Sequence, residues 1–360
     1  MRGVKTTVHL IYPHGSKASC PDAIGRHLAA RLRSRYDVRL YDWQAFGKIQ
    51  PGGNDVLVGH ACPVYFTVFR RSCRAKGWKR VLLLSPYCHG DDHQPAFNEA
   101  LVRHCDLYLA ITGGYWFADI EKSGYKHWLP KMRHLDLAID RAEFPSIKRS
   151  FNPVGRRRIV YIGSDAWYKN TRYLAAIAES MPETEFGWIG TDRSVGNIEG
   201  LGHRSLTTAE GRALVSGYDI LLTVGKADGN PATILEAMAW GLIPVCTPQS
   251  GYVGFQSILN VPINDTAGAV QVLWSLLVEP EARLREIQEQ NWRLLDEYFN
   301  WDRFAAQVVA AIESEEAPAC VPVSIGRRLE LLFAEIFNPF WANLLDPRKM
   351  RKRLRKIQVV

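Results

Sequence analysis

Short hydrophobic runs alternate with longer segments of helical periodicity along the first half of the chain. Apolar runs of about four to eight residues between polar or turn residues predict buried strands. Start signals from Ser19 to Pro21 precede a predicted helix over Pro21–Tyr36, and another helical segment lies near Tyr65–Ala75. The predicted strands are Thr7–Pro13, Asp37–Asp42, Asp55–His60, Arg80–Tyr87 and Asp106–Thr112. Strands that alternate with helices predict an α/β fold with a mostly parallel, doubly wound sheet.

A second alternation of the same kind begins after a polar and basic segment, Arg149–Arg158, which we interpret as a linker. Its predicted strands are Arg157–Gly163, Glu185–Gly190, Tyr218–Leu222 and Leu242–Cys246, with helices over Tyr173–Met181 and Ala209–Gly217. We therefore expect two domains, residues 1–150 and 151–318, because 360 residues exceed one typical domain.

Residues 319–360 differ from the rest of the chain. From about Ile325, apolar and aromatic residues recur at helical spacing, and the basic run Arg348–Lys356 follows. One interpretation is an amphipathic, basic tail that contacts an anionic membrane surface, and the other is a helix that packs back on the first domain. The basic run favours the membrane contact.

Composition narrows the class of protein. Hydrophobic residues make up 47% and charged residues 23%, which is typical of a globular protein. The seven cysteines are odd in number and contain no CxxC pair, which favours reduced thiols in a cytoplasm over disulfides or zinc. No signal peptide or apolar stretch of about 20 residues is evident, so we expect a cytoplasmic protein, peripheral to the inner face of a membrane if the tail binds lipid. The net charge of +8 favours anionic partners.

The segment Asp228–Gly241, reading DGNPATILEAMAWG, carries the strongest chemical signal. It joins two predicted buried strands, so its loop lies at the edge of the sheet where α/β folds bind ligands. Asp228 and Glu236 can accept hydrogen bonds from hydroxyls. The amides of Asn230, Ala232 and Thr233 stand where a helix begins, which suits an anion. Carboxylates that accept hydrogen bonds from hydroxyls, beside amides that donate hydrogen bonds to phosphate, predict a nucleotide-sugar site.

This segment resembles the E-x7-E motif of family 4 glycosyltransferases, which are retaining enzymes with the GT-B fold. The match includes the glycine, the proline, LEAMA, the later glycine and PV, whereas Asp228 replaces the first glutamate. The resemblance implies two Rossmann-like domains that face a cleft, with the donor in the second domain and the acceptor in the first. It also implies that Asp228 contacts the donor sugar and Glu236 the ribose hydroxyls.

A second loop, Tyr161–Asn170, is similar to the family's GRxxxxKG segment. Gly163 and Lys169 keep the spacing, but Ser164 stands where the family has arginine. The resemblance implies that Lys169 neutralises the donor diphosphate, since a cation there stabilises the leaving group. Arg172 and Arg193 are candidates to replace the missing cation, and the alternative for Lys169 is a solvated loop lysine.

In the first domain, two histidines and a glycine follow predicted strands. His89 resembles a family histidine that lines the cleft near the reacting carbon, and His60 resembles one that shapes the acceptor pocket. Gly15, in the first strand-to-helix loop, would allow the backbone to approach phosphate closely. A satisfied loop histidine is the alternative for His89.

The sequence thus predicts a retaining transferase that moves a sugar from a nucleotide-diphosphate donor to a hydroxyl. The expected acceptor is a glycan or lipid-linked precursor of the surface-polysaccharide or lipopolysaccharide type. We expect no metal and no cofactor, because no DxD motif lies in a plausible donor loop, Asp91–Asp92 has the pattern of an exposed loop, and the resemblance implies metal-independent enzymes. A nucleic-acid binder is supported by charge alone and lacks interleaved aromatic and basic residues, so we expect no nucleic-acid partner. The alternatives are another GT-B enzyme, such as a sugar-nucleotide epimerase, and a catalytically silent GT-B scaffold that binds nucleotide or a partner. Asp228 and Ser164 favour the silent scaffold.

Overall fold

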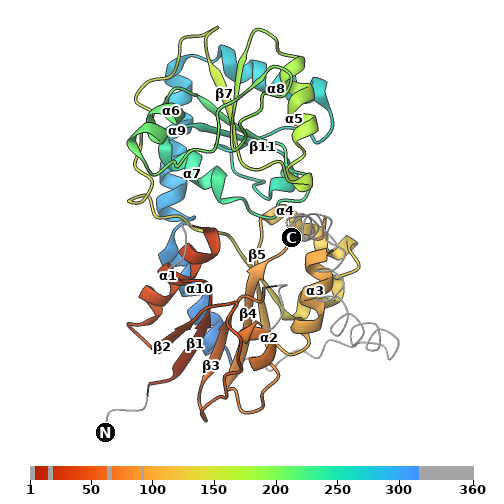
Figure 1. Cartoon of the computed structure of the whole chain (residues 1–360), viewed down its shortest axis with the longest axis vertical. Helices are drawn as coiled ribbons and strands as arrows, with labels where there is room; N and C mark the ends of the chain where they lie inside the picture. The colour runs from red at the N-terminus through yellow and green to blue at the C-terminus, as the bar shows by residue number, and fades with distance from the viewer. Residues whose placement is uncertain (1–4, 15–18, 63–66, 91–92, 316–360) are drawn as a thin grey trace, which may run out of the picture.

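The computed structural model of this chain describes residues 5–14, 19–62, 67–90 and 93–315. The described residues form two lobes that lie one above the other in Figure 1. Gly15 and the tail, residues 319–360, fall outside the described residues, so what the sequence predicts for them stays a prediction.

The first lobe is built on a six-stranded sheet in which every neighbouring pair is parallel. Its strands follow the order β2-β1-β3-β4-β5-β6. Their bounds are Thr7–Ile11 (β1), Asp37–Tyr41 (β2), Val56–Gly59 (β3), Arg80–Pro86 (β4), Leu107–Ile111 (β5) and Met132–Leu135 (β6). The central strands β3 and β5 are buried along their whole length, as continuous apolar runs in a covered parallel sheet should be.

The second lobe repeats this architecture with a different strand order, β12-β11-β10-β7-β8-β9, again entirely parallel. Its strands are Arg158–Ile162 (β7), Glu185–Ile189 (β8), Ile198–Gly200 (β9), Ile220–Thr223 (β10), Ile243–Cys246 (β11) and Leu259–Asn260 (β12). The predicted pair of doubly wound α/β domains is therefore confirmed.

Helices cover the faces of both sheets (Figure 1). The first lobe contains α1 (Cys20–Leu32), α2 (Val68–Ser72), α3 (His93–Val102) and α4 (Gly114–Asp119), with the 3-10 turns η1 (Ile120–Lys122) and η2 (Lys126–Lys131). The second contains α5 (Thr171–Glu179), α6 (Ala209–Ser216), α7 (Ala232–Trp240), α8 (Thr266–Val278) and α9 (Glu281–Glu297), with the turns η3 (Trp167–Lys169) and η4 (Pro248–Ser250).

The start of α1 follows from its sequence. Ser19 is the N-cap, its hydroxyl oxygen accepts a hydrogen bond from the Asp22 amide at 3.3 Å, and Pro21 occupies the first turn. These signals place the N-terminus of α1 at the carboxyl end of β1.

The last described helix, α10 (Trp301–Glu313), returns to the first lobe. It packs against α1 and β4, although its residues lie within the range 151–318 predicted for the second domain. Buried Trp301, Phe304 and Val308 supply its apolar face. Figure 1 shows α10, in blue, among the strands and helices of the first lobe.

The strand orders identify where ligands can bind. In the first sheet the order reverses between β1 and β3, and in the second it reverses between β7 and β10. The connections that leave neighbouring strands at such a switch point run to opposite faces of the sheet and leave a crevice at its carboxyl edge. The loops after β1, β3, β7 and β10 therefore border the candidate site.

Three glycines bring the two lobes into backbone contact. The Gly113 amide of the first lobe donates a hydrogen bond to the Gly229 carbonyl oxygen of the second at 2.7 Å. A Cβ added to Gly113 would lie 2.1 Å from the Gly251 carbonyl oxygen, and one added to Gly229 would lie 2.6 Å from the Tyr87 carbonyl oxygen. Side chains at these positions would hold the lobes apart.

Among the described residues, no helix is both long enough and apolar enough to cross a membrane.

We predict that Gly113→Ala loosens the contact between the lobes. The φ of Gly113 is −83°, which alanine adopts freely, so the effect comes from the added Cβ alone. Overpacking at a rigid contact typically costs about 1–3 kcal/mol, so the melting temperature should fall and the radius of gyration should rise. Calorimetry and small-angle scattering measure the two quantities. Gly124→Ala, where an added Cβ meets nothing within 4 Å, is the matched control and should behave as the unmodified protein.

Candidate functional site

The two loops at the switch point of the second sheet bring Lys169 and Asp228 together. Lys169 ends the turn η3 after β7, and Asp228 follows β10, the strand paired with β7. The Lys169 Nζ donates to Asp228 Oδ2, and the two side chains are 18% and 17% exposed. The Lys226 amide donates to the Tyr168 carbonyl oxygen at 2.8 Å, which fixes one loop against the other. Asn170 adopts φ 58°, a left-handed conformation at the position where the GRxxxxKG pattern has its last glycine.

Helix α7 carries Glu236 into the region between the lobes. Pro231 is its N-cap and provides no side-chain hydrogen bond, so the amides of Ala232 and Thr233 have no partner within the helix. Burial raises the pKa of Glu236 to about 7. Glu236 therefore changes its charge near neutral pH, unlike an ordinary surface glutamate.

Asn230 has a role that the sequence did not indicate. Its Oδ1 accepts a hydrogen bond from the Leu137 amide of the first lobe at 2.6 Å, and its buried Nδ2 has no partner among the described residues. The side chain thus connects the two lobes beside the start of α7.

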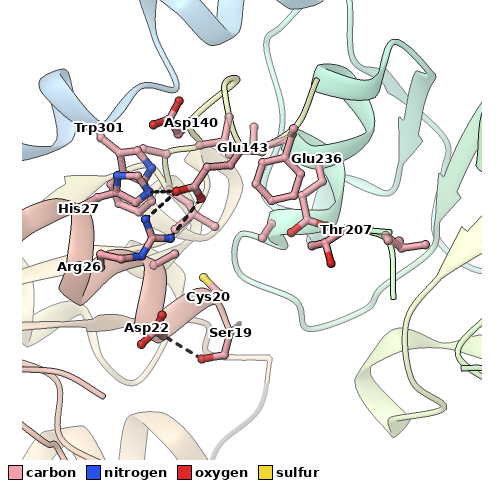
Figure 2. Close-up of a pocket in the computed structure, with 18 of the residues that line it drawn as sticks. Ser19, Cys20, Asp22, Arg26, His27, Asp140, Glu143, Thr207, Glu236 and Trp301 are labelled. Carbon is pink, nitrogen blue, oxygen red and sulfur yellow. Dashed lines mark hydrogen bonds and ion pairs between the residues drawn. The ribbon is translucent and has the colours of Figure 1, made fainter. Parts of the chain in front are cut away.

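Two cavities adjoin along the boundary between the lobes. The first, of about 330 Å³, is lined by Tyr12, Cys20, Pro21, Ile24, His60, Pro86, Cys88, Ile111, Leu137, Tyr168 and the run Ala227–Ala232. The second, of about 280 Å³, contains Glu236 and Thr207 opposite the N-terminal turns of α1 (Figure 2). Cys20, Leu137 and Ala232 line both, so the cleft runs from the Asp228 loop along α7 to Glu236 and Trp240.

Cys20 stands where the two cavities meet. Cys20 is exposed at its surface, yet desolvation in the cleft, together with the negative charges of Glu236 and Asp228, raises the pKa of its thiol to about 12. The thiol therefore stays protonated at neutral pH and is a poor nucleophile.

The first lobe contributes His60 to the wall of the larger cavity. Its ring packs on Trp43 and Tyr12, with centroids 4.8 and 6.0 Å apart. Burial lowers its pKa to about 3, so the imidazole is neutral at physiological pH. Neutral imidazole can bind a hydroxyl but does not supply a positive charge.

His89 lies beside the cleft, and its side chain contacts Tyr87 and Asp119 of the first lobe. Its Nδ1 lies 3.1 Å from the Tyr87 hydroxyl, and its Nε2 lies 3.1 Å from Asp119 Oδ2. It lines neither of the two cavities. The structure thus brings Asp228 and Lys169 together and places His89 outside their immediate contacts.

Gly163 and Ser164 support the η3 loop. The Gly163 carbonyl oxygen accepts a hydrogen bond from the Trp188 indole at 2.8 Å, and the Ser164 carbonyl oxygen accepts one from the Tyr161 hydroxyl at 2.9 Å. Neither residue lines the two cavities, and Ser164, like Arg172 and Arg193, is exposed.

A cluster that the sequence did not predict lies at the Glu236 end of the cleft (Figure 2). Arg26 on α1 binds both carboxylate oxygens of Glu143, at 2.6 and 3.1 Å. His27 Nε2 is 3.3 Å from the same carboxylate, and the His27 ring stacks on Trp301 of α10 at 4.7 Å. These residues come from α1, the segment after β6 and α10, which lie far apart in the chain, so no local pattern announces the cluster.

Within the described part of the chain, one group has the composition of a metal site. Ligand atoms of His27, Asp140 and Glu143 lie within 4.8 Å of one another. Arg26 already binds both oxygens of Glu143, and a guanidinium beside a cation site opposes metal binding.

Comparison with known proteins identifies the fold. No protein-family model matches the chain, and no curated protein matches it in sequence. Sucrose-phosphate synthase from Thermosynechococcus elongatus aligns with a TM-score of 0.60 and 13% identity, over 85% of this chain and 98% of that one. Anabaena HepE, solved with UDP and glucose, gives 0.58 and 11% over 85% and 99%. An alpha-glucosyltransferase, solved with UDP and a 13-mer DNA, gives 0.57 and 11% over 87% and 100%. The chain therefore has the GT-B fold of these glycosyltransferases.

We predict that Glu236 makes stability fall as the pH rises from about 4.5 to about 7. In this range the folded protein keeps the proton on Glu236, whereas the unfolded chain, with its ordinary pKa of 4.5, has lost it. Glu236→Gln removes the titration. The free energy of unfolding of the variant should therefore rise by up to about 3 kcal/mol relative to the unmodified protein as the pH goes from 4.5 to 8. Urea unfolding at several pH values measures this. Glu289→Gln, on the exposed face of α9, is the control and should leave the pH dependence of stability unchanged. If the Glu236→Gln variant shows the same pH dependence as the unmodified protein, the assignment is wrong.

Proposed function

We propose that this protein is a glycosyltransferase that binds a nucleoside-diphosphate sugar in the cleft between its lobes. The observation that carries the proposal is the convergence of Lys169, Asp228 and the first turn of α7 at one switch point, with Glu236 one cavity further along. The cation and the amides suit a diphosphate, and the two carboxylates suit the hydroxyls of a sugar and of a ribose. The GT-B fold supports the proposal, since HepE was solved with UDP and glucose.

Each residue has a distinct task in this proposal. The amides of Ala232 and Thr233 and the ammonium of Lys169 bind phosphate oxygens, and Asp228 accepts a sugar hydroxyl once Lys169 turns towards the diphosphate. Glu236 accepts hydrogen bonds from ribose hydroxyls in its ionised form. Because its pKa is about 7, ribose binding should favour loss of its proton.

We further propose that transfer retains the anomeric configuration. The bond between the anomeric carbon and the diphosphate oxygen breaks, and its electron pair leaves with the diphosphate. The acceptor oxygen attacks the same face, and its proton passes to the departing phosphate oxygen. Lys169 and the α7 amides stabilise the charge that develops there. This scheme needs no protein base, in keeping with the protonated thiol of Cys20 and with the pKa of about 3 that makes His60, in the larger cavity, a weak base.

The acceptor in this proposal is a hydroxyl of a glycan or of a lipid-linked glycan precursor, reached at the cytoplasmic face of a membrane. The proposal includes no resident metal. Arg26, which binds both oxygens of Glu143, supports this part because it opposes a cation at the three-residue group.

A catalytically silent scaffold is the second candidate function. The observation that favours it is charge balance, since Asp228 pairs with Lys169 and Ser164 offers no cation. Such a scaffold would bind nucleotide and transfer no sugar.

We predict that nucleoside diphosphates raise the melting temperature of the full-length protein and that Lys169→Met weakens their binding at least tenfold. A hydrogen bond to a charged group contributes about 1.5–3 kcal/mol, which corresponds to this factor or more. A thermal-shift screen followed by calorimetric titration measures the affinities. Binding of the matching nucleoside without phosphates should not change, and Lys79→Met, an exposed lysine of the first lobe, is the control. If no nucleoside diphosphate stabilises the protein, the proposed function is wrong.

We predict that the linkage formed has the anomeric configuration of the donor. Turnover with a panel of nucleotide sugars and acceptors, followed by proton NMR of the product, reads the configuration from the coupling constant of the anomeric proton. Inversion would exclude attack on the same face, and binding without any turnover across the panel would support the silent scaffold.

A further inference from the structure

We propose that Trp167 and Lys226 form an acceptor platform at the rim of the cleft, which binds a saccharide carrying a carboxylate or phosphate group. The inference rests on the proposed function and extends it to the chemical class of the acceptor. The term acceptor platform is used below for these two residues.

The position of the platform follows from its chain neighbours. Tyr168 and Ala227 line the larger cavity beside Asp228, whereas Trp167 and Lys226 line neither cavity. Glu236 belongs to the other cavity, which lies further along α7. The acceptor platform therefore stands just outside the candidate sugar site, at the end away from the candidate ribose site.

Both lobes border the acceptor platform. A Cβ added to Gly90, in the loop after β4, would lie 3.3 Å from the Lys226 carbonyl oxygen and 2.9 Å from Ala227 Cβ. The loop that carries Lys226 thus touches the first lobe. A saccharide held here would contact the lobe that the sequence assigned to the acceptor.

The geometry of the pair is that of a cation over an aromatic ring. Lys226 Nζ lies 4.9 Å from the centroid of the Trp167 ring, and the Trp167 side chain is 51% exposed. The hydrogen bond from the Lys226 amide to the Tyr168 carbonyl oxygen holds the two loops together. The indole edge also meets the ring of Tyr168 at an interplanar angle of 87°. An exposed indole is therefore held at a defined place beside the site.

The chemistry of the pair selects the ligand. An exposed indole offers an apolar surface that matches the C–H face of a pyranose ring. Lys226 is exposed, and no carboxylate pairs with it in the described ranges, whereas Asp228 balances the charge of Lys169. An uncompensated ammonium beside an apolar surface attracts a sugar with its own negative charge.

The described residues offer a matched comparison. Trp274 on α8 is 42% exposed, and among the described residues no lysine or arginine is found over its ring. It lines neither cavity. Exposure of a tryptophan is therefore common to both positions, whereas the cation and the place at the cleft belong to Trp167.

The test measures saccharide binding to the full-length chain by saturation-transfer NMR titration. The probes are methyl β-glucuronide, glucose 6-phosphate and the neutral methyl β-glucoside. The variants are Trp167→Ala, Lys226→Met and, as controls, Trp274→Ala and Lys79→Met, the latter at an exposed lysine of the first lobe. Trp167→Tyr keeps an aromatic ring and should keep most of the binding, which separates loss of the platform from a folding defect.

We expect at least one charged probe to bind at least fivefold more tightly than methyl β-glucoside. Trp167→Ala should lower the affinity at least fivefold for every probe that binds the unmodified protein. Lys226→Met should abolish only the preference for charged probes and leave the affinity for the neutral probe unchanged. The controls should match the unmodified protein. A preference for the glucuronide identifies a carboxylate, and a preference for the phosphate identifies a phosphorylated sugar.

The acceptor platform is excluded if no probe binds the unmodified protein, if Trp167→Ala and Trp274→Ala have equal effects, or if Lys226→Met weakens the neutral probe as much as the charged ones. These outcomes differ from failure of the proposed function. The melting shift with nucleoside diphosphates should be the same in the Trp167→Ala variant as in the unmodified protein, whereas a wrong proposed function would abolish that shift in the unmodified protein itself.

Discussion

The backbone contact between Gly113, Gly229 and Gly251 is the constraint on which the candidate site depends. At this point the main chains of the two lobes approach so closely that a single Cβ would collide with a carbonyl group of the opposite lobe. The contact is adjacent in sequence to Asp228 and Asn230, so it also sets how far the Asp228 loop stands from the strands of the first lobe. Small residues at this point thus determine the width of the cleft.

Given that contact, the strand orders decide which side chains meet. Both sheets are parallel, so all their carboxyl edges carry loops, but only the switch points leave a crevice between loops. Lys169 and Asp228 are 59 residues apart in sequence and form an ion pair because β7 and β10 are neighbours. Two oppositely charged groups that neutralise each other can remain partly buried without a ligand, and in the proposed function a diphosphate competes for the lysine.

The cleft varies in polarity along its length. At one end, burial raises the pKa of Glu236 to about 7, and Arg26 ties α1 to Glu143 nearby. In the middle, neutral His60 and the protonated thiol of Cys20 add no charge. At the rim, Lys226 adds an unbalanced positive charge. In the proposed function, this order separates the tasks of binding nucleotide, sugar and acceptor.

The sequence by itself determined the two α/β domains, because alternating apolar runs and helical segments report burial directly. It also predicted the Asp228–Gly241 unit and the spacing of Gly163 and Lys169, since these features lie within single loops and helices. Only the tertiary structure decided that Lys169 pairs with Asp228, that Asn230 reaches Leu137, and that Arg26, His27 and Glu143 meet beneath Trp301. These contacts join segments far apart in the chain, and their geometry depends on strand order and on the return of α10 to the first lobe. Local hydrophobic periodicity carries no information on either, because it records which residues are buried and not what they are buried against.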